Sequence, residues 1–168
     1  MFGFLFAVVL AIDPAHSTAQ FSVTHVFVEH VIGTVPILHG NIDLPPGSTI
    51  PTSVTAQLDA AHLHTDDPDR DASLMSDDWF DTKTYPTWSF TSTKIVPATN
   101  GFTMNGMLSI HGVSQPETLT VITTGTAEHP HYRATCHIDR HAFGLKITKL
   151  DPAIGNPVDV TLDVVPIR

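Results

Sequence analysis

The stretch Val158-Asp159-Val160-Thr161-Leu162-Asp163-Val164 decides the class of fold, because apolar and polar residues alternate strictly along it. A period of two places the apolar side chains on one face of a β-strand and the polar side chains on the other. The same period recurs within residues 21–25, 54–64 and 102–110, whereas helical periodicity is scarce. The sequence therefore predicts an all-β protein in which each strand has one buried face.

Turn-forming residues divide the chain at short intervals, since it contains 13 Pro and 10 Gly. About eight strands are indicated, and their closure into an antiparallel barrel would leave no strand edge exposed. Two short helices are expected, around residues 25–33 and 70–80, with Asp67 or Asp69 as the N-cap of the second. No repeat or change of composition divides the chain, so residues 12–168 are expected to form one barrel domain.

The charge and the cysteine content exclude several classes of partner and bond. The chain has 8 Lys and Arg against 17 Asp and Glu, a formal charge of −9, and no basic run. Nucleic acid is therefore not expected as a partner, and an anionic membrane surface is disfavoured. Cys136 is the single cysteine, so no intrachain disulfide is expected, and it is interpreted as a small core residue.

The first eleven residues are apolar throughout. They are too short to span a bilayer, which needs about 20 residues, so no stable membrane insertion is expected. Their length and lack of alternation resemble the hydrophobic part of a secretory signal, although the positive residues that usually precede it are missing. We interpret residues 1–11 as a signal-peptide remnant, and the alternative is a hydrophobic first strand.

Six segments, in order and at consistent spacing between residues 12 and about 166, together resemble one known family. Each segment is short, but the set resembles the YceI-like family of polyisoprenoid-binding, lipocalin-like bacterial proteins. The segments are residues 12–17, 21–25, 33–44, 70–93, 105–114 and 138–145, the last followed by the strand at 158–164.

The resemblance implies an eight-stranded antiparallel lipocalin-like β-barrel, capped by one or two short helices, whose lumen holds a long apolar chain. Ligands of the family are polyisoprenoid lipids, including isoprenoid quinones, and fatty amides. The implied function is that of a carrier for a polyisoprenoid or quinone-like lipid, with no catalytic residue, no metal and no cofactor besides the lipid. Members are commonly periplasmic or secreted, some are cytoplasmic, and homodimers are frequent.

The chain departs from the family pattern at four positions. Ser73 stands where a histidine is usual, and His62 stands where a serine is usual. Val35 and Leu38 replace aromatic residues. The smaller side chains predict a locally wider cavity or a different choice of ligand chain.

A long prenyl chain is held by buried area, since each buried CH₂ contributes about 0.8 kcal/mol. The inward apolar positions of the strands and of the capping segment are therefore the predicted cavity lining. The alternative for each of them is that it packs in the core, because the interior of a small barrel divides between the two uses. The predicted lining residues are Phe21, Val23, Val54, Ala56, Leu58, Trp79, Phe80, Trp88, Phe90, Met104, Leu108, Ile110, Phe143, Leu145, Val160 and Leu162.

Residues 70–81 form a polar turn with an amphipathic continuation between two predicted strands. Arg70 and Asp71 are expected to anchor this capping segment to a neighbouring strand by charge-assisted hydrogen bonds. The alternative is that Arg70 contacts a ligand head group or phosphate. Trp79 and Phe80 are expected to roof the end of the barrel.

Three of the 11 histidines carry a second hypothesis. His62 and His64 lie in strand phase, so both rings are expected on one side, and His25 is expected inward on another strand. We interpret them as polar residues at the wet end of the cavity. The alternative is a metal-binding barrel, since converging imidazoles bind Zn²⁺ or Cu²⁺.

The third reading, a lipid hydrolase, has the least support in the sequence. Neither a nucleophile elbow nor a Cys-His pairing is found. The chain is therefore not expected to be an enzyme.

Overall fold

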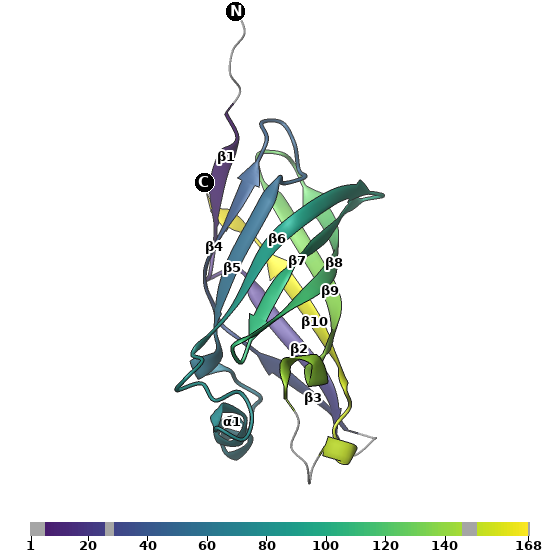
Figure 1. The fold of residues 1–168 in the computed structure, drawn as a ribbon. Helices are drawn as coiled ribbons and strands as arrows, with labels where there is room; N and C mark the ends of the chain where they lie inside the picture. Colours follow the sequence, from purple (N-terminus) through teal and green to yellow (C-terminus); the bar gives the residue numbers. More distant parts are fainter. Residues whose placement is uncertain (1–5, 26–28, 146–150, 168) are drawn as a thin grey trace, which may run out of the picture.

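The computed structural model of the chain describes residues 6–25, 29–145 and 151–167. The strands are β1 (Val8–Ile12), β2 (Thr18–His25), β3 (Glu29–Thr34), β4 (Ile37–Leu44), β5 (Ser53–Asp59), β6 (Thr87–Ala98), β7 (Gly101–Ile110), β8 (Val113–Gly125), β9 (Pro130–Asp139), β10 (Pro157–Val164) and β11 (Pro166–Ile167). They form one curled antiparallel sheet in the order β11-β1-β4-β5-β6-β7-β8-β9-β10-β2-β3, wrapped around an elongated interior (Figure 1).

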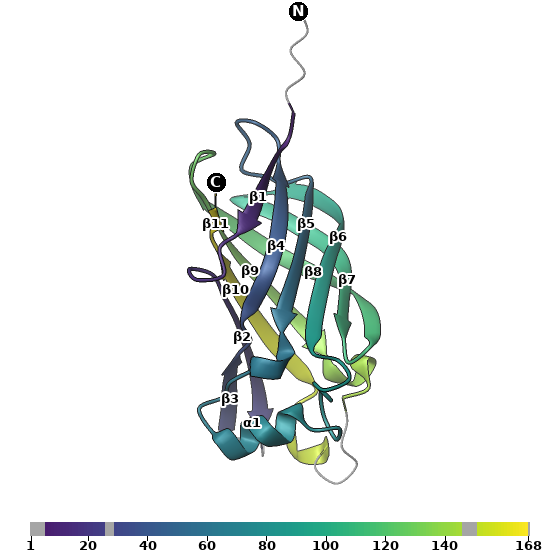
Figure 2. The same cartoon turned by 90° about the vertical axis from the view of Figure 1, so that its left-hand side faces the viewer.

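The barrel-like all-β architecture is confirmed, but the predicted count of eight strands is wrong. Three extended runs of chain are each divided into two strands by a short break, at residues 13–17, 35–36 and 165. Strand β2 pairs with β3 and β10, whereas β1 pairs with β4 and β11, which continue those two strands. Both ends of the sheet order therefore lie against the single run that contains β1 and β2 (Figure 2).

One α-helix, α1 (Pro68–Met75), lies at one end of the barrel (Figure 1). The Asp67 side chain accepts hydrogen bonds from the backbone N–H groups of Asp69 and Arg70, and Pro68 occupies the first turn, where its missing N–H costs nothing. The predicted helix at 70–80 is confirmed for its first half, with Asp67 as the N-cap. One-turn 3₁₀ helices are η1 (Ala60–His62), η2 (Arg140–Phe143) and η3 (Asp151–Ala153).

The helix predicted around residues 25–33 is wrong. Residues 29–34 form β3, which pairs in register with residues 20–25 of β2, and residues 26–28 lie outside the described part. Val31 is buried and its neighbours in the strand, His30 and Ile32, are exposed, which is the alternation of a strand. Tertiary pairing with β2 decides the conformation of this short segment.

Strand β1 occupies the second half of the apolar segment 1–11. Leu10 and Ile12 are buried, whereas Val8 and Val9 are exposed, and the strand pairs with β4 and β11. Residues 1–5 lie outside the described part of the chain. The interpretation of the segment as a signal-peptide remnant stays a prediction.

The buried side chains face the interior of the curled sheet. In β9 every second residue from Pro130 to Ile138 is buried and every residue between them is exposed. Cys136 lies in this buried row, as its interpretation as a core residue predicts. Phe143 of η2 is the largest fully buried side chain among the described residues.

Candidate ligand-binding cavity

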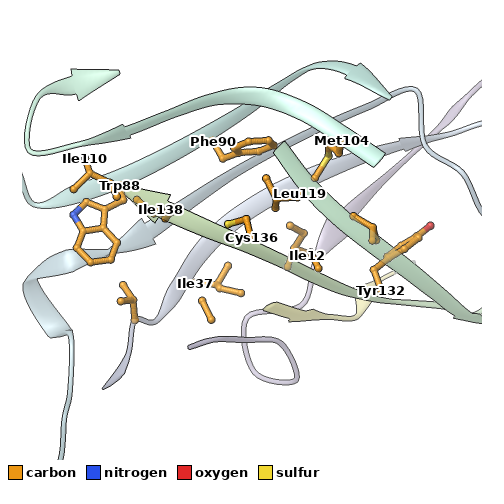
Figure 3. Packing of buried hydrophobic residues seen from close by; sticks show 14 of the residues in the cluster. Ile12, Ile37, Trp88, Phe90, Met104, Ile110, Leu119, Tyr132, Cys136 and Ile138 are labelled. Atoms are coloured by element: carbon orange, nitrogen blue, oxygen red, sulfur yellow. The ribbon is translucent and has the colours of Figure 1, made fainter. Parts of the chain in front are cut away.

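The interior of the sheet contains a cavity of about 600 Å³, within the range of about 300–1,000 Å³ typical of small-molecule sites. Its wall is built from strands across the whole sheet and from the segment around α1. Figure 3 shows Phe90, Met104, Leu119 and Cys136, which come from four different strands, gathered around the same interior. Apolar side chains make up most of this wall.

Most of the predicted lining residues lie in the cavity wall, including Trp79 and Phe80 of the capping segment. Phe143 does not: it is fully buried in η2 and packs in the core. The structure also places His25 and Arg70 in the wall, but not His62, His64 or Asp71. The predicted residues that line the cavity are Phe21, Val23, Val54, Ala56, Leu58, Trp79, Phe80, Trp88, Phe90, Met104, Leu108, Ile110, Leu145, Val160 and Leu162.

Sequence reasoning missed further lining residues although their signal was present. Tyr132, Ala134 and Ile138 share the inward phase of β9 with Cys136, and all four line the cavity. Ile12, Ile42, Phe102, Leu119 and Val121 were missed in the same way. The period of two identified the buried face correctly, but it did not show that this face borders a cavity.

One end of the cavity is apolar and closed by aromatic side chains. The Tyr132 hydroxyl donates a hydrogen bond of 2.9 Å to the Thr49 carbonyl oxygen, in the loop between β4 and β5. The Phe102 and Tyr132 rings meet edge to face with centroids 5.9 Å apart. Burial raises the pKa of Tyr132 to about 12, so this hydroxyl stays protonated and neutral at physiological pH.

The other end of the cavity, near α1, carries most of its polar side chains. They are His25, Glu29, Asp67, Asp69, Arg70, Ser73 and Arg140. Arg140 is 3% exposed, and its guanidinium donates to the carbonyl oxygens of Gly155, Leu145 and Ile154 at 2.6–2.9 Å. The cavity thus has an apolar depth and a polar end, the arrangement that suits an amphiphile.

The capping segment is anchored through Thr65. The Asp71 carboxylate accepts hydrogen bonds from the Thr65 backbone N–H and hydroxyl, and Arg70 donates to the Thr65 hydroxyl and carbonyl oxygens. His64, adjacent to Thr65, exchanges two backbone hydrogen bonds with Thr34 at the end of β3. Arg70 and Asp71 therefore hold α1 to the segment before it, which is itself attached to the sheet.

His64 adds an ionisable contact to this anchor. Its Nδ1 lies 3.1 Å from the Asp71 carboxylate and its Nε2 lies 2.8 Å from that of Asp66. The hydrogen bond to Asp71, followed by that to Asp66, raises the pKa of His64 above its usual 6.5. Burial alone would raise the pKa of Asp71, but hydrogen bonds from Thr65 and His64 outweigh it and hold that pKa below 3.8.

Replacing His64 with Gln should lower the melting temperature by an amount that depends on pH. A raised His pKa gives stability that is complete below pH 6.5 and is lost as the pH rises through the folded-state value. A lowered Asp pKa gives stability that is lost as the pH falls below 3.8. The difference between wild type and H64Q should be largest between these limits and shrink towards pH 9. Thermal melts across pH 4–9 check this, with H39Q, at an exposed position on β4, as the control; a pH-independent difference would contradict it.

The lid consists of Leu74, Trp79 and Phe80, which all line the cavity. The Phe80 ring packs against the Trp88 ring with centroids 4.8 Å apart, which joins the lid to strand β6. Trp88 is 8% exposed, and its indole Nε1 has no hydrogen-bond partner among the described residues. A buried N–H of this kind is a donor that an acceptor on a ligand in the cavity would satisfy.

The hypothesis of a metal site at His25, His62 and His64 is wrong, because β5 ends at Asp59 and the strand phase does not continue. The Asp59 side chain caps η1 and also lies 2.6 Å from His62 Nδ1. His64 contacts Asp66 and Asp71, whereas His25 lies 3.6 Å from Glu29. Within the described residues, no group of three or more His, Cys, Asp or Glu could hold a metal ion.

The helices of the described residues are all too short or too polar to cross a bilayer.

Two comparisons with known sequences match most of this chain. The family model described as a YceI-like domain matches residues 10–165. A UPF0312 protein of Shewanella denitrificans is 30% identical over 158 residues, which is 90% of this chain and 81% of that protein.

Solved structures share the fold. Burkholderia cenocepacia BcnA has a TM-score of 0.83 and 22% identity, over 92% of this chain and 98% of that one. A polyisoprenoid binding domain from Saccharophagus degradans, implicated in plant cell wall breakdown, has a TM-score of 0.69 and 15% identity, over 95% and 98% of the two chains.

Proposed function

We propose that this chain, which belongs to the YceI-like family, is a carrier that holds a long-chain polyisoprenoid or quinone-like lipid in its lumen. The observation that carries the proposal is the cavity of about 600 Å³ whose wall is mostly apolar. Each CH₂ buried there contributes about 0.8 kcal/mol, so a prenyl chain of several units gains more than any single polar contact can supply.

The two ends of the cavity give the bound lipid a direction. The apolar end, closed by Phe102 and Tyr132, suits the tail of the prenyl chain. The end near α1, where Arg70 and Arg140 lie in the wall, suits the head group. The polyisoprenoid-binding domain of Saccharophagus degradans, with the same fold, supports a prenyl chain as the cargo.

The same proposal includes the location of the protein and the absence of a catalytic role. The signal-like segment 1–11 supports a periplasmic or secreted location. The chain is assigned no catalytic role, since binding by area needs none.

The test is to identify what the purified protein holds and what it accepts. Organic-solvent extraction followed by mass spectrometry should release a long-chain lipid. Polyprenol and a prenylated quinone should each raise the melting temperature of delipidated protein, since a ligand that binds the native state stabilises it. A protein that yields no lipid and whose melting temperature neither compound changes would refute the proposal.

Replacing Trp88 with Phe should weaken binding of a prenylated quinone about fivefold while leaving the matching prenyl hydrocarbon unaffected. Trp88 lines the cavity and its buried Nε1 has no hydrogen-bond partner among the described residues, so a quinone carbonyl oxygen could accept its hydrogen bond if the ring turns towards the ligand. A net hydrogen bond is worth about 0.5–1.5 kcal/mol, or roughly two- to tenfold in affinity. Displacement of a fluorescent apolar probe measures both affinities, with Trp79→Phe as the matched control. Equal losses for the two ligands would mean that Trp88 contributes area alone.

A further inference from the structure

Strands β8 and β9 separate halfway along their length. They pair from Thr120↔Thr135 to Gly125↔Pro130, whereas β8 begins at Val113 and β9 continues to Asp139. The separated part of β8 remains paired with β7, and that of β9 remains paired with β10. The wall of the barrel is therefore intact on both sides of a gap between these two strands.

The gap is a framed opening rather than a frayed edge. The Thr120–Thr135 pair bounds it on one side, and the Gln115 side chain bounds it on the other by donating to the Ala142 carbonyl oxygen of η2 at 3.0 Å. Pro116 lies inside the frame and has no N–H to donate to a neighbouring strand. The gap contains a hollow of about 350 Å³, and we call this opening, between residues 116–120 and 135–137, the side window.

Glu117 and Cys136 line both the side window and the main cavity, so these two residues lie at the boundary between the two. Glu117 lies in the inward phase of β8, two residues before the buried Leu119. Glu117 is thus a carboxylate between the window, whose lining includes Thr118, Thr120 and Thr135, and the mostly apolar lumen. No described residue donates a hydrogen bond to the Glu117 carboxylate or forms an ion pair with it.

Within residues 6–25, 29–145 and 151–167, no cation forms an ion pair with Glu117. Burial, followed by the charge of Glu117, raises the pKa of Cys136 to about 12, so the thiol is neutral. His137 faces the outer side, where its Nδ1 pairs with Asp159. Burial, followed by the charge of Asp139, raises the pKa of Glu117. A cation placed beside Glu117 would act against both effects and favour the ionised carboxylate.

We propose that the side window is a second binding site, in which an amphiphilic alkylamine places its ammonium group on Glu117 and its alkyl chain in the lumen. The proposal rests on the lumen of the proposed function for the alkyl chain, but not on the identity of the prenyl lipid. In this proposal the ligand enters from the side through the window. The lumen buries the alkyl chain, and the Glu117 carboxylate pairs with the ammonium group.

The test compares dodecylamine, an ammonium ion at pH 7, with dodecan-1-ol, its neutral counterpart of equal length. Both tryptophans of the chain, Trp79 and Trp88, line the cavity, so their fluorescence reports its occupancy in a titration. Glu117→Gln should weaken dodecylamine binding at least about tenfold and leave dodecan-1-ol binding unchanged within twofold. Glu128→Gln, which removes an exposed carboxylate outside the cavity in the loop between β8 and β9, should change neither. Equal affinity of wild type and E117Q for dodecylamine, or no binding of dodecylamine to wild type, would overturn the proposal.

A second measurement on the wild-type protein keeps the test independent of any folding defect in E117Q. Dodecylamine should bind wild type less tightly at pH 4, where protonation of Glu117 is favoured by its raised pKa, than at pH 7, whereas dodecan-1-ol should bind equally at both; equal dodecylamine affinity at the two pH values would count against Glu117 as the partner. The same variants titrated with a prenylated quinone separate the two proposals. If E117Q loses dodecylamine binding but still binds the quinone, the window site is supported. If the quinone binds none of the variants, the proposed prenyl carrier is refuted, and the proposed window site is unaffected.

Discussion

Replacing Ala134 with Trp should lower the affinity for prenyl lipids by at least about 100-fold while the protein remains folded. Ala134 is 6% exposed, lies midway along β9 and faces the cavity, opposite Val121 of β8 and Leu162 of β10. An indole ring there takes up part of the 600 Å³ that the lipid would fill. Excluding four CH₂ groups costs about 3 kcal/mol, which is more than 100-fold in affinity. Because the new side chain enters open space rather than a packed core, overpacking is limited.

The control for this prediction is Ile122→Trp. Ile122 is 49% exposed on the outer face of β8, so an indole there adds the same bulk outside the cavity. Probe displacement by a prenylated quinone should give the wild-type affinity for I122W and a loss of at least 100-fold for A134W. Circular dichroism checks that both variants retain the β-sheet spectrum. Wild-type affinity in folded A134W would mean that the lipid does not bind in the lumen.

Strand β9 shows how much of the ligand-binding cavity can be predicted from the sequence. The alternation of Tyr132, Ala134, Cys136 and Ile138 identifies the buried face of the strand correctly. It cannot distinguish a side chain that packs in the core from one that borders a cavity, because both are shielded from water. Phe143 shows the same ambiguity: it was predicted to line the lumen and instead fills the core beneath η2.

Other features depended on where local pairing stops. His62 and His64 continue the period of β5 in the sequence, but Asp59 caps a 3₁₀ turn and ends the strand before them. The breaks at residues 13–17, 35–36 and 165 raise the number of strands above the predicted eight, because the chain exchanges one neighbour for another there. The side window arises in the same way, from the end of pairing between β8 and β9 at Thr120. The sequence of one strand does not show where its hydrogen bonding to a neighbouring strand ends.

Replacing Arg140 with Met should lower the free energy of unfolding by about 3–5 kcal/mol, because Arg140 donates to three carbonyl groups in two backbone segments, at Leu145 and at Ile154–Gly155, at the polar end of the cavity. Its Nε donates to the Gly155 carbonyl oxygen, its Nη1 to that of Leu145 and its Nη2 to that of Ile154, and the side chain is almost fully buried. Methionine keeps much of the apolar stem but leaves three carbonyl groups without their donor. Each unsatisfied buried group costs about 1–3 kcal/mol, and the desolvation of the lost charge is recovered in part.

The matched control is Arg133→Met, on the exposed face of β9, the strand that leads into η2. Arg133 donates to Asp163 at 3.3 Å with its side chain 62% exposed, and exposed ion pairs of this kind contribute about 0–1 kcal/mol. Urea unfolding should therefore show a large fall in midpoint for R140M and a small one for R133M, with similar slopes if both stay two-state. If R140M matched R133M, the three carbonyl groups would have other donors in the variant, and the hydrogen bonds of the buried guanidinium would not be what stabilises this end of the barrel.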